Sequence, residues 1–224
     1  MNNTKKKSPI SWIPTAYFAM GLPFVVLNMV TVLMFKGLEV DDKLITFWTS
    51  LILLPWTLKP LWSPFLELFR TKKFFVIVTQ LITGITFGLV AFALNLSHFF
   101  SISIALLAIV AFSGATHDIA CDGVYMSELS NEDQARFIGW QGAFYNIAKI
   151  LATGGLVYLA GYFIELNADA GLLTANKRAW MIILLILSVT MILLGIYHLF
   201  ALPSTQSASS RKTLRSNKEV MKEL

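Results

Sequence analysis

The chain of 224 residues has few charged side chains, one cysteine and three histidines. Only 14% of its residues are charged, against about 25% in a soluble globular domain, which leaves too few charges for a water-facing surface of this size. The single cysteine, Cys121, excludes a disulfide scaffold, and the scarcity of Cys and His argues against a metal centre built from those ligands. We therefore expect an integral membrane protein with no resident metal or cofactor.

The sequence contains long apolar segments. Apolar residues make up 56% of the chain, against about 45–50% in soluble domains. Crossing a hydrocarbon layer of about 30 Å takes about 20 helical residues, and six runs reach that length without the alternation of barrel strands. The sequence predicts an all-α polytopic membrane protein whose transmembrane helices lie at about 12–36, 44–66, 74–95, 98–126, 137–165 and 178–202. They form one bundle over 12–202, between an N-terminal tail at 1–11 and a basic tail or linker at 203–224.

Basic residues concentrate on one side of this predicted bundle. Six spans place both termini on the same side, and 12 of the 18 Lys and Arg residues fall there. Because basic loops stay in the cytoplasm, we expect both termini to be cytoplasmic. The net charge of +5 then reflects orientation in the lipid bilayer, and no nucleic-acid partner is expected. The 12 residues are Lys5, Lys6, Lys7, Arg70, Lys72, Lys73, Arg136, Arg211, Lys212, Arg215, Lys218 and Lys222.

Span two carries a lysine among prolines. Lys59 lies between Pro55 and Pro60, and Pro64 follows, so the helix loses backbone donors and is expected to bend. The lysine is roughly 22 Å into the membrane from Leu44, at about 1.5 Å per residue. It either extends to the cytoplasmic headgroups or faces inward, where an intramembrane charge binds an anion or an acidic partner. Both interpretations stay open at this point.

Span four carries two carboxylates on one helix face. Asp118 and Asp122 are four residues apart, so the charge on one opposes ionisation of the other, and either becomes a candidate carrier of a coupling proton. A structural ion pair with Lys59, or simple exposure at the cytoplasmic mouth, are the alternatives. The neighbouring His117 points about 100° away, and we expect it to be a hydrogen-bonded packing residue.

Span five carries a polar stripe. Gln141, Tyr145 and Lys149 follow one another at intervals of four and share one helix face. Lys149 falls near the bilayer midplane, where a lysine does not easily reach the headgroups. Asn28 of span one lies near the expected bend at Pro23. We expect a polar cavity bounded by spans one, two, four and five, because these spans carry interior polar groups.

Glycines in spans three and five predict close contacts between helices. Gly84 and Gly88 lie in span three, and span five contains Gly139, Gly142, Gly154, Gly155 and Gly161. Glycine lets two helix backbones approach closely in a membrane. The spacing in span five does not form a phosphate-binding G-x-G-x-x-G loop.

One motif raises an enzymatic alternative. Gly114, Asp118 and Asp122 resemble the second half of the CDP-alcohol phosphotransferase signature, whose first half is missing here. Two carboxylates on one helix are also too few oxygen ligands for a catalytic Mg²⁺. We therefore expect no enzymatic activity.

Three segments resemble a known family of transporters. The segments "PWTLKPLWSP" in span two, "ATHDIACDG" in span four and "GWQGAFYN" in span five closely resemble the anhydromuropeptide permease branch of the major facilitator superfamily, which is related to the acetyl-coenzyme A transporters. The loop Ser63-x-x-x-Glu67, with Arg70, Lys72 and Lys73 after it, resembles a degenerate form of the superfamily motif G-x-x-x-D-R-x-G-R-R. His117 stands where glutamine is common in that branch.

The resemblance implies a secondary transporter of the bacterial cytoplasmic (inner) membrane that imports muropeptides together with protons. Lys59 and Lys149 would bind the carboxylates of the solute, with Gln141, Tyr145 and Asn28 beside them. Asp118 and Asp122 would carry the coupling proton. A cytoplasmic gate would consist of Glu67, Arg70, Lys72 and Lys73.

The resemblance also implies a missing partner. Members of the family have two six-helix halves with the solute between them, and this chain matches the N-terminal half. The partner would be a C-terminal half or a second copy, and the chain would be a fragment, a split gene product or a half that pairs. A transporter of acetyl-coenzyme A or another organic anion is the alternative within transport, and a non-transporting membrane assembly partner is the alternative outside it.

Overall fold

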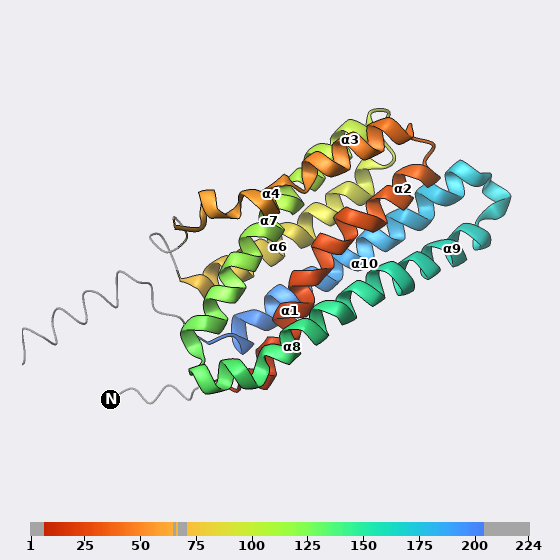
Figure 1. Cartoon of the computed structure of the whole chain (residues 1–224). Helices are drawn as coiled ribbons and strands as arrows, with labels where there is room; N and C mark the ends of the chain where they lie inside the picture. Colours follow the sequence, from red (N-terminus) through yellow and green to blue (C-terminus); the bar gives the residue numbers. More distant parts are fainter. Residues whose placement is uncertain (1–6, 65, 67–70, 204–224) are drawn as a thin grey trace, which may run out of the picture.

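The structure, a computed structural model, describes residues 7–64, 66 and 71–203, and this part of the chain is built from helices (Figure 1). Six of them are long and apolar enough to cross a membrane, and each overlaps one predicted span. For the described residues, the predictions of an all-α fold and of six helices long and apolar enough to cross a membrane are therefore confirmed. Residues 1–6 and 204–224 of the two predicted tails lie outside that part. The six helices are Pro9–Gly37, Asp42–Leu61, Lys72–Ala93, Phe99–Glu128, Asn131–Leu166 and Leu172–Ala201.

Three of the spans change helix type along their length. Span one consists of α1 (Pro9–Val25), the π-helical segment η1 (Val26–Val30) and α2 (Thr31–Gly37). Span two consists of α3 (Asp42–Ile52), α4 (Leu54–Leu58) and the 3₁₀ segment η2 (Lys59–Leu61). Span five consists of α8 (Asn131–Ile150), the π-helical segment η3 (Leu151–Leu156) and α9 (Val157–Leu166). The other three spans are single α-helices: α6 (Lys72–Ala93), α7 (Phe99–Glu128) and α10 (Leu172–Ala201).

Local sequence accounts for these changes. Pro55 lies in the first turn of the short helix α4, and Pro60 lies in η2. A proline is tolerated at a helix start but removes a backbone donor from a helix interior. The prolines expected to bend span two thus coincide with its division into α3, α4 and η2. In span one, Pro23 precedes η1, and the hydroxyl of Thr31 donates to the Leu27 carbonyl at 2.7 Å, which replaces part of the regular backbone pattern.

Polar residues cap three of the helices at their N-termini. The Asp41 carboxylate accepts from the backbone N–H of Lys43 at 2.9 Å at the start of α3. Thr71 accepts from Phe74 at 3.2 Å at the start of α6, and Ser130 accepts from Asp133 at 3.1 Å at the start of α8. Each side chain satisfies a backbone donor that the first helical turn leaves free.

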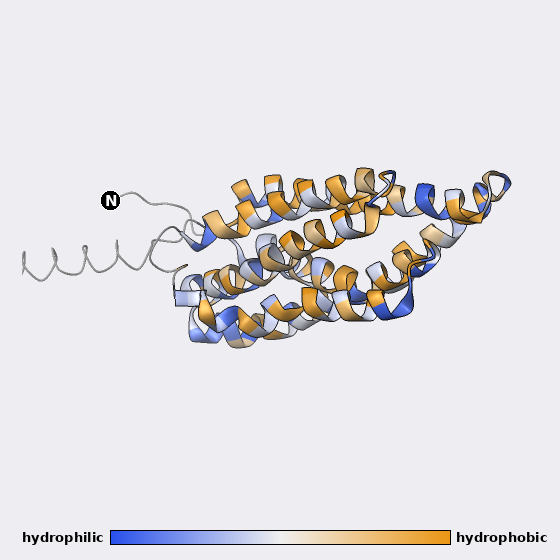
Figure 2. Cartoon of the chain, turned by 90° about the horizontal axis from the view of Figure 1, so that it is seen from above, coloured by the Kyte–Doolittle hydropathy of each residue, from blue (hydrophilic) through white to orange (hydrophobic). Residues whose placement is uncertain are grey.

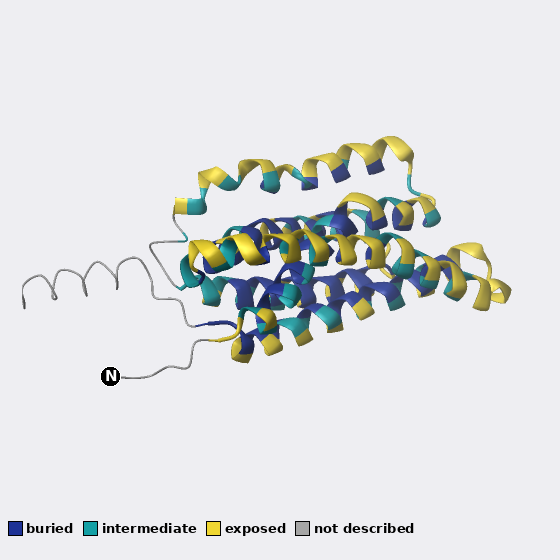
Figure 3. Cartoon of the chain, turned by 60° about the horizontal axis from the view of Figure 1, so that its bottom comes forward, coloured by how far each residue is buried: buried dark blue, intermediate teal, exposed yellow. Residues whose placement is uncertain are grey.

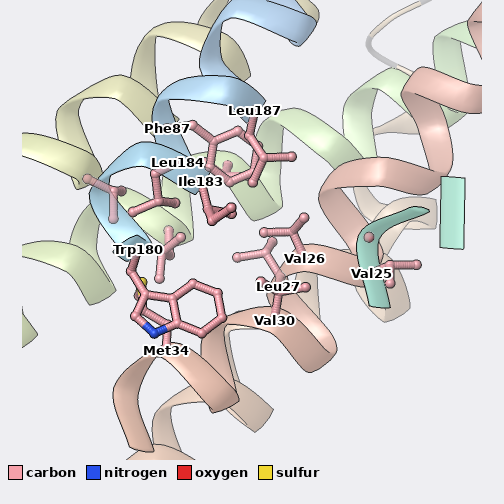
Figure 4. Close-up of a cluster of buried hydrophobic side chains, with 14 of the residues drawn as sticks. Val25, Val26, Leu27, Val30, Met34, Phe87, Trp180, Ile183, Leu184 and Leu187 are labelled. Carbon is pink, nitrogen blue, oxygen red and sulfur yellow. The ribbon is translucent and has the colours of Figure 1, made fainter. Parts of the chain in front are cut away.

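The core joins span one to α6 and α10. α6 packs along both α7 and α10, and α1 packs along α8. Figure 4 shows the centre, where apolar side chains of span one face those of the other two helices. Because lipid is as apolar as these side chains, close packing holds the helices together more than transfer out of water. The labelled residues are Val25, Val26, Leu27, Val30 and Met34 of span one, Phe87 of α6, and Trp180, Ile183, Leu184 and Leu187 of α10.

Spans two and five lie at the edge of the bundle. In the most apolar stretch of each span, 67% of the residues of span one are buried, compared with 22% in span two and 17% in span five. Figure 3 shows the exposed outer surface of α3 and α4. Hydrophobic residues nevertheless run along these helices, and hydrophilic residues gather toward the helix ends (Figure 2). Both spans thus have the composition of membrane helices but cover little of the core.

The two sets of glycines occupy different environments. A Cβ on Gly84 would lie 2.7 Å from Cγ1 of Ile192 and 2.9 Å from the Ser188 carbonyl, so the predicted close contact in span three is confirmed, against α10. The prediction for span five is wrong within the described residues. At four of its five glycines, an added methyl group would have no neighbour within 4 Å, because this side of the helix faces away from the bundle. The four glycines are Gly139, Gly142, Gly154 and Gly161.

The helix order generates a prediction about orientation. Asp41 and Ala170 are exposed, in the α2–α3 connection and the α9–α10 turn, and these segments lie at the end of the bundle opposite to the start of α6, which Thr71 caps (Figure 1). If both termini are cytoplasmic, a membrane-impermeant thiol reagent added to intact cells labels Asp41→Cys and Ala170→Cys and spares Thr71→Cys. The native Cys121 is buried and adds little background. Labelling of Thr71→Cys from outside would reverse the orientation.

Candidate functional site

An ion pair joins spans two and four. Nζ of Lys59 lies 2.7 Å from Oδ2 of Asp118. The Asp118 side chain is 11% exposed and that of Lys59 is 27% exposed, so the pair is largely shielded from its surroundings. Lys59 therefore faces inward, against an acidic partner, and does not extend to the headgroups. The predicted alternative of an ion pair between Lys59 and Asp118 is therefore present.

A tryptophan shares the same carboxylate oxygen. Nε1 of Trp56 donates to Oδ2 of Asp118 at 2.9 Å. Trp56 and Lys59 are three residues apart, which places both on one side of span two, next to α7. The second oxygen of Asp118, Oδ1, is buried and accepts no hydrogen bond from the described residues. Oδ2 thus accepts both hydrogen bonds, and Oδ1 has no described donor.

The second predicted carboxylate has a different environment. Asp122 is exposed, and its Oδ1 accepts from the hydroxyl of Tyr17 on α1 at 2.9 Å. The ring of Tyr17 is buried and lies edge-on to Tyr125, with 5.9 Å between the ring centroids. The two carboxylates share one face of α7, as predicted, but only Asp118 pairs with a cation among the described residues.

The predicted solute-binding residues of span five lie on one continuous helix. Gln141 and Tyr145 are half-buried and Lys149 is exposed, all on α8. Tyr145 packs against Gly21 of α1, where a Cβ would lie 3.1 Å from Cδ2 of its ring. Asn28 is exposed within η1. Among the described residues no hydrogen bond or ion pair links these four side chains to the Lys59–Asp118 pair.

The predicted cytoplasmic gate is described in part. Nζ of Lys73 donates to the carbonyls of Leu199 at 2.8 Å and Leu202 at 2.9 Å, which caps the C-terminus of α10. Lys72 lies over Gly123 of α7, where a Cβ would approach its Cδ to 2.6 Å. Glu67 and Arg70 lie outside the described residues.

A buried polar chain links four helices, and only one of its members was expected. The amide nitrogen of Gln80 on α6 donates to Nε2 of His117 on α7 at 2.9 Å, and the amide oxygen accepts from Nδ1 of His198 on α10 at 2.8 Å. Thr15 on α1 bonds to Nε2 of His198 at 2.9 Å. The prediction that His117 is a hydrogen-bonded packing residue is confirmed. Gln80, the one amide side chain within α6, was the available signal for the rest.

One hollow on the described surface is apolar. It has a volume of about 330 Å³ between α3 and α7, and its lining includes Trp48, Ile52, Phe100 and Ile104. No group of three or more His, Cys, Asp or Glu residues within the described ranges could hold a metal ion. The charged side chains that the structure brings together between spans two and four are Lys59 and Asp118, with Asp122 one turn further along α7.

No protein-family model and no curated protein matches the chain.

The buried polar chain generates a prediction about stability. Gln80→Leu removes two hydrogen bonds and leaves two imidazole nitrogens without partners, each at a cost of about 1–3 kcal/mol. We expect the variant to unfold at a lower SDS fraction in mixed micelles than the wild-type protein. The matched control is Gln141→Leu on the half-buried face of α8, whose side chain bonds to no described residue. Equal stability of the two variants would contradict the role of Gln80.

Proposed function

We propose that this chain is the N-terminal six-helix half of a proton-coupled secondary transporter of the major facilitator type. The observation that carries the proposal is the Lys59–Asp118 ion pair, which joins two membrane-spanning helices. An unpaired charge inside a membrane is costly, and charged residues there usually belong to a pathway for ions or solutes. The similarity of the segments around Lys59 and Asp118 to the muropeptide permeases supports the same function.

The pair supplies a way to link a proton to a solute. A carboxylate of the solute that binds Lys59 takes the place of Asp118, and a proton on Asp118 then takes the place of the lost cation. Each exchange keeps the buried site free of an unpaired charge, whose desolvation would otherwise be unfavourable. Coupling further requires that Asp118 differ in proton affinity between the outward-facing and inward-facing states.

The face around span five would complete the site. Lys149 and Asn28 are exposed on membrane-spanning helices, and no acidic group of the described residues pairs with Lys149. A charge at this depth is unfavourable against lipid. The row of glycines on span five that meets no other helix is also suited to close contact with another chain segment. A second six-helix half over this face would enclose a polar cavity between the two halves.

The solute we propose is a muropeptide, taken up from the periplasm across the bacterial inner membrane. Its carboxylates would bind Lys59 and Lys149, while Gln141, Tyr145 and Asn28 would bind its sugar and amide groups. Acetyl-coenzyme A and other organic anions would engage the same lysines, so competition in uptake assays distinguishes these solutes.

The two carboxylates generate a prediction about coupling. In membrane vesicles that contain the full-length transporter, Asp118→Asn or Asp122→Asn should abolish accumulation driven by the proton gradient. Both variants should retain exchange of labelled solute with preloaded vesicles, because exchange needs no net proton movement. The matched control is Asp169→Asn, which changes an exposed carboxylate in the turn before α10. Protonophore-sensitive accumulation by both variants would place the coupling proton elsewhere.

A further prediction concerns the charge on span five. Lys149→Ala should abolish muropeptide uptake and leave the abundance of the protein in the membrane unchanged, because the exposed side chain supports no described contact. Lys43→Ala, at the exposed start of α3, is the control and should transport normally. Lys149→Arg is not an equivalent control, because a planar guanidinium differs from an ammonium in shape and donor geometry. Wild-type uptake by Lys149→Ala would remove this residue from the site.

A further inference from the structure

Trp56 binds Asp118 through a donor that carries no charge of its own. Its indole N–H is a neutral donor and lies 2.9 Å from Oδ2, the oxygen that also binds Lys59. The ammonium of Lys59 can leave when a proton or an anion changes the local charge. The indole N–H has no such competitor, because it neither titrates nor attracts an anion as an ammonium does.

The position of the indole depends on a glycine one turn before Asp118. A Cβ on Gly114 would lie 2.8 Å from Cζ2 and 3.1 Å from Cη2 of Trp56. Gly114 and Asp118 are four residues apart on α7, so the ring lies across the glycine and its N–H reaches the carboxylate. The ring also meets Phe24 of α1 edge-on, with 5.2 Å between centroids. The indole thus contacts both α7 and α1, and at Gly114 it lies where any larger residue of α7 would collide with it.

We propose that Trp56, seated on Gly114, is the positioning residue that holds the Asp118 carboxyl in place while Lys59 exchanges partners. The inference rests on the proposed function for the exchange itself. Without the indole, Asp118 would lose its last described hydrogen bond at each release of Lys59, and its side chain would have no donor to fix its rotamer. The proton would then be taken up at an undefined position, and solute movement would lose its link to the gradient.

The first test is spectroscopic and independent of transport. The infrared band of the Asp118 carboxyl is identified by its loss in Asp118→Asn. Trp56→Phe keeps an aromatic ring on Gly114 but removes the donor, and should shift this band. The matched control is Trp62→Phe: Nε1 of Trp62 has no hydrogen-bond partner among the described residues, so the band should stay in place. An unshifted band in Trp56→Phe would overturn the proposal.

The second test distinguishes the role of Gly114, against which the indole packs, from the role of the Trp56 N–H as a hydrogen-bond donor. Gly114→Ala should shift the band in the same sense as Trp56→Phe, since the added methyl group displaces the indole. Gly155→Ala is the control, because its methyl group would be in ordinary contact with Leu151 at 3.7 Å. The double variant Gly114→Ala/Trp56→Phe should match Trp56→Phe alone. Fully additive shifts would show that Gly114 does not act through Trp56.

The third test is transport in vesicles with the full-length protein. Trp56→Phe should lower the accumulation ratio of muropeptide by about tenfold and leave exchange intact, since hydrogen bonds to charged groups have about this effect on an equilibrium. Trp56→Phe that accumulates solute at the wild-type ratio would overturn the positioning role. If the wild-type protein moves no muropeptide but the band shifts as expected, the contact between Trp56 and Asp118 stands and the proposed function fails.

Discussion

The ion pair between Lys59 and Asp118 is the interaction on which the attachment of span two to the bundle depends. A membrane-spanning helix that carries a lysine needs a counter-charge or a path to water, because neither lipid nor an apolar core solvates an ammonium. Span two buries little of its surface and touches the bundle mainly along α7. The pair, together with the hydrogen bond from Trp56, therefore fixes the position of a span that has few other attachments to the core.

The two kinds of polar contact in the bundle have different consequences. Gln80 and its two histidine partners connect α6, α7 and α10 through neutral groups, and Thr15 extends the chain to α1. These contacts need no external partner and suit a rigid unit. In the proposed transporter, the Lys59–Asp118 pair would instead exchange each member for a proton or an anion. The fold thus combines a fixed core of four helices with a charged contact at its edge, where a change of ionic partners has the least packing to disturb.

Length and hydropathy were sufficient to predict the six helices, because membrane thickness sets one requirement for every span. Residue spacing also predicted the shared face of Asp118 and Asp122, since that face follows from helix geometry alone. Contacts between helices were harder to predict. Sequence patterns left the partner of Lys59 open, did not indicate that Gln80 binds two histidines, and treated the glycines of spans three and five alike. Gly84 meets α10 and Gly142 meets nothing, and only the packing of whole helices decides that difference.

A double-mutant cycle on the ion pair tests this account most directly. Unfolding of the wild-type protein, Lys59→Met, Asp118→Asn and the double variant would be followed by SDS titration in mixed micelles. Each single variant leaves one polar group without its partner, so the double variant should be more stable than the sum of the two losses implies. We predict a coupling free energy of about 2–3 kcal/mol, in the upper range for residues in direct contact. Additive losses, with no coupling between Lys59 and Asp118, would contradict the account.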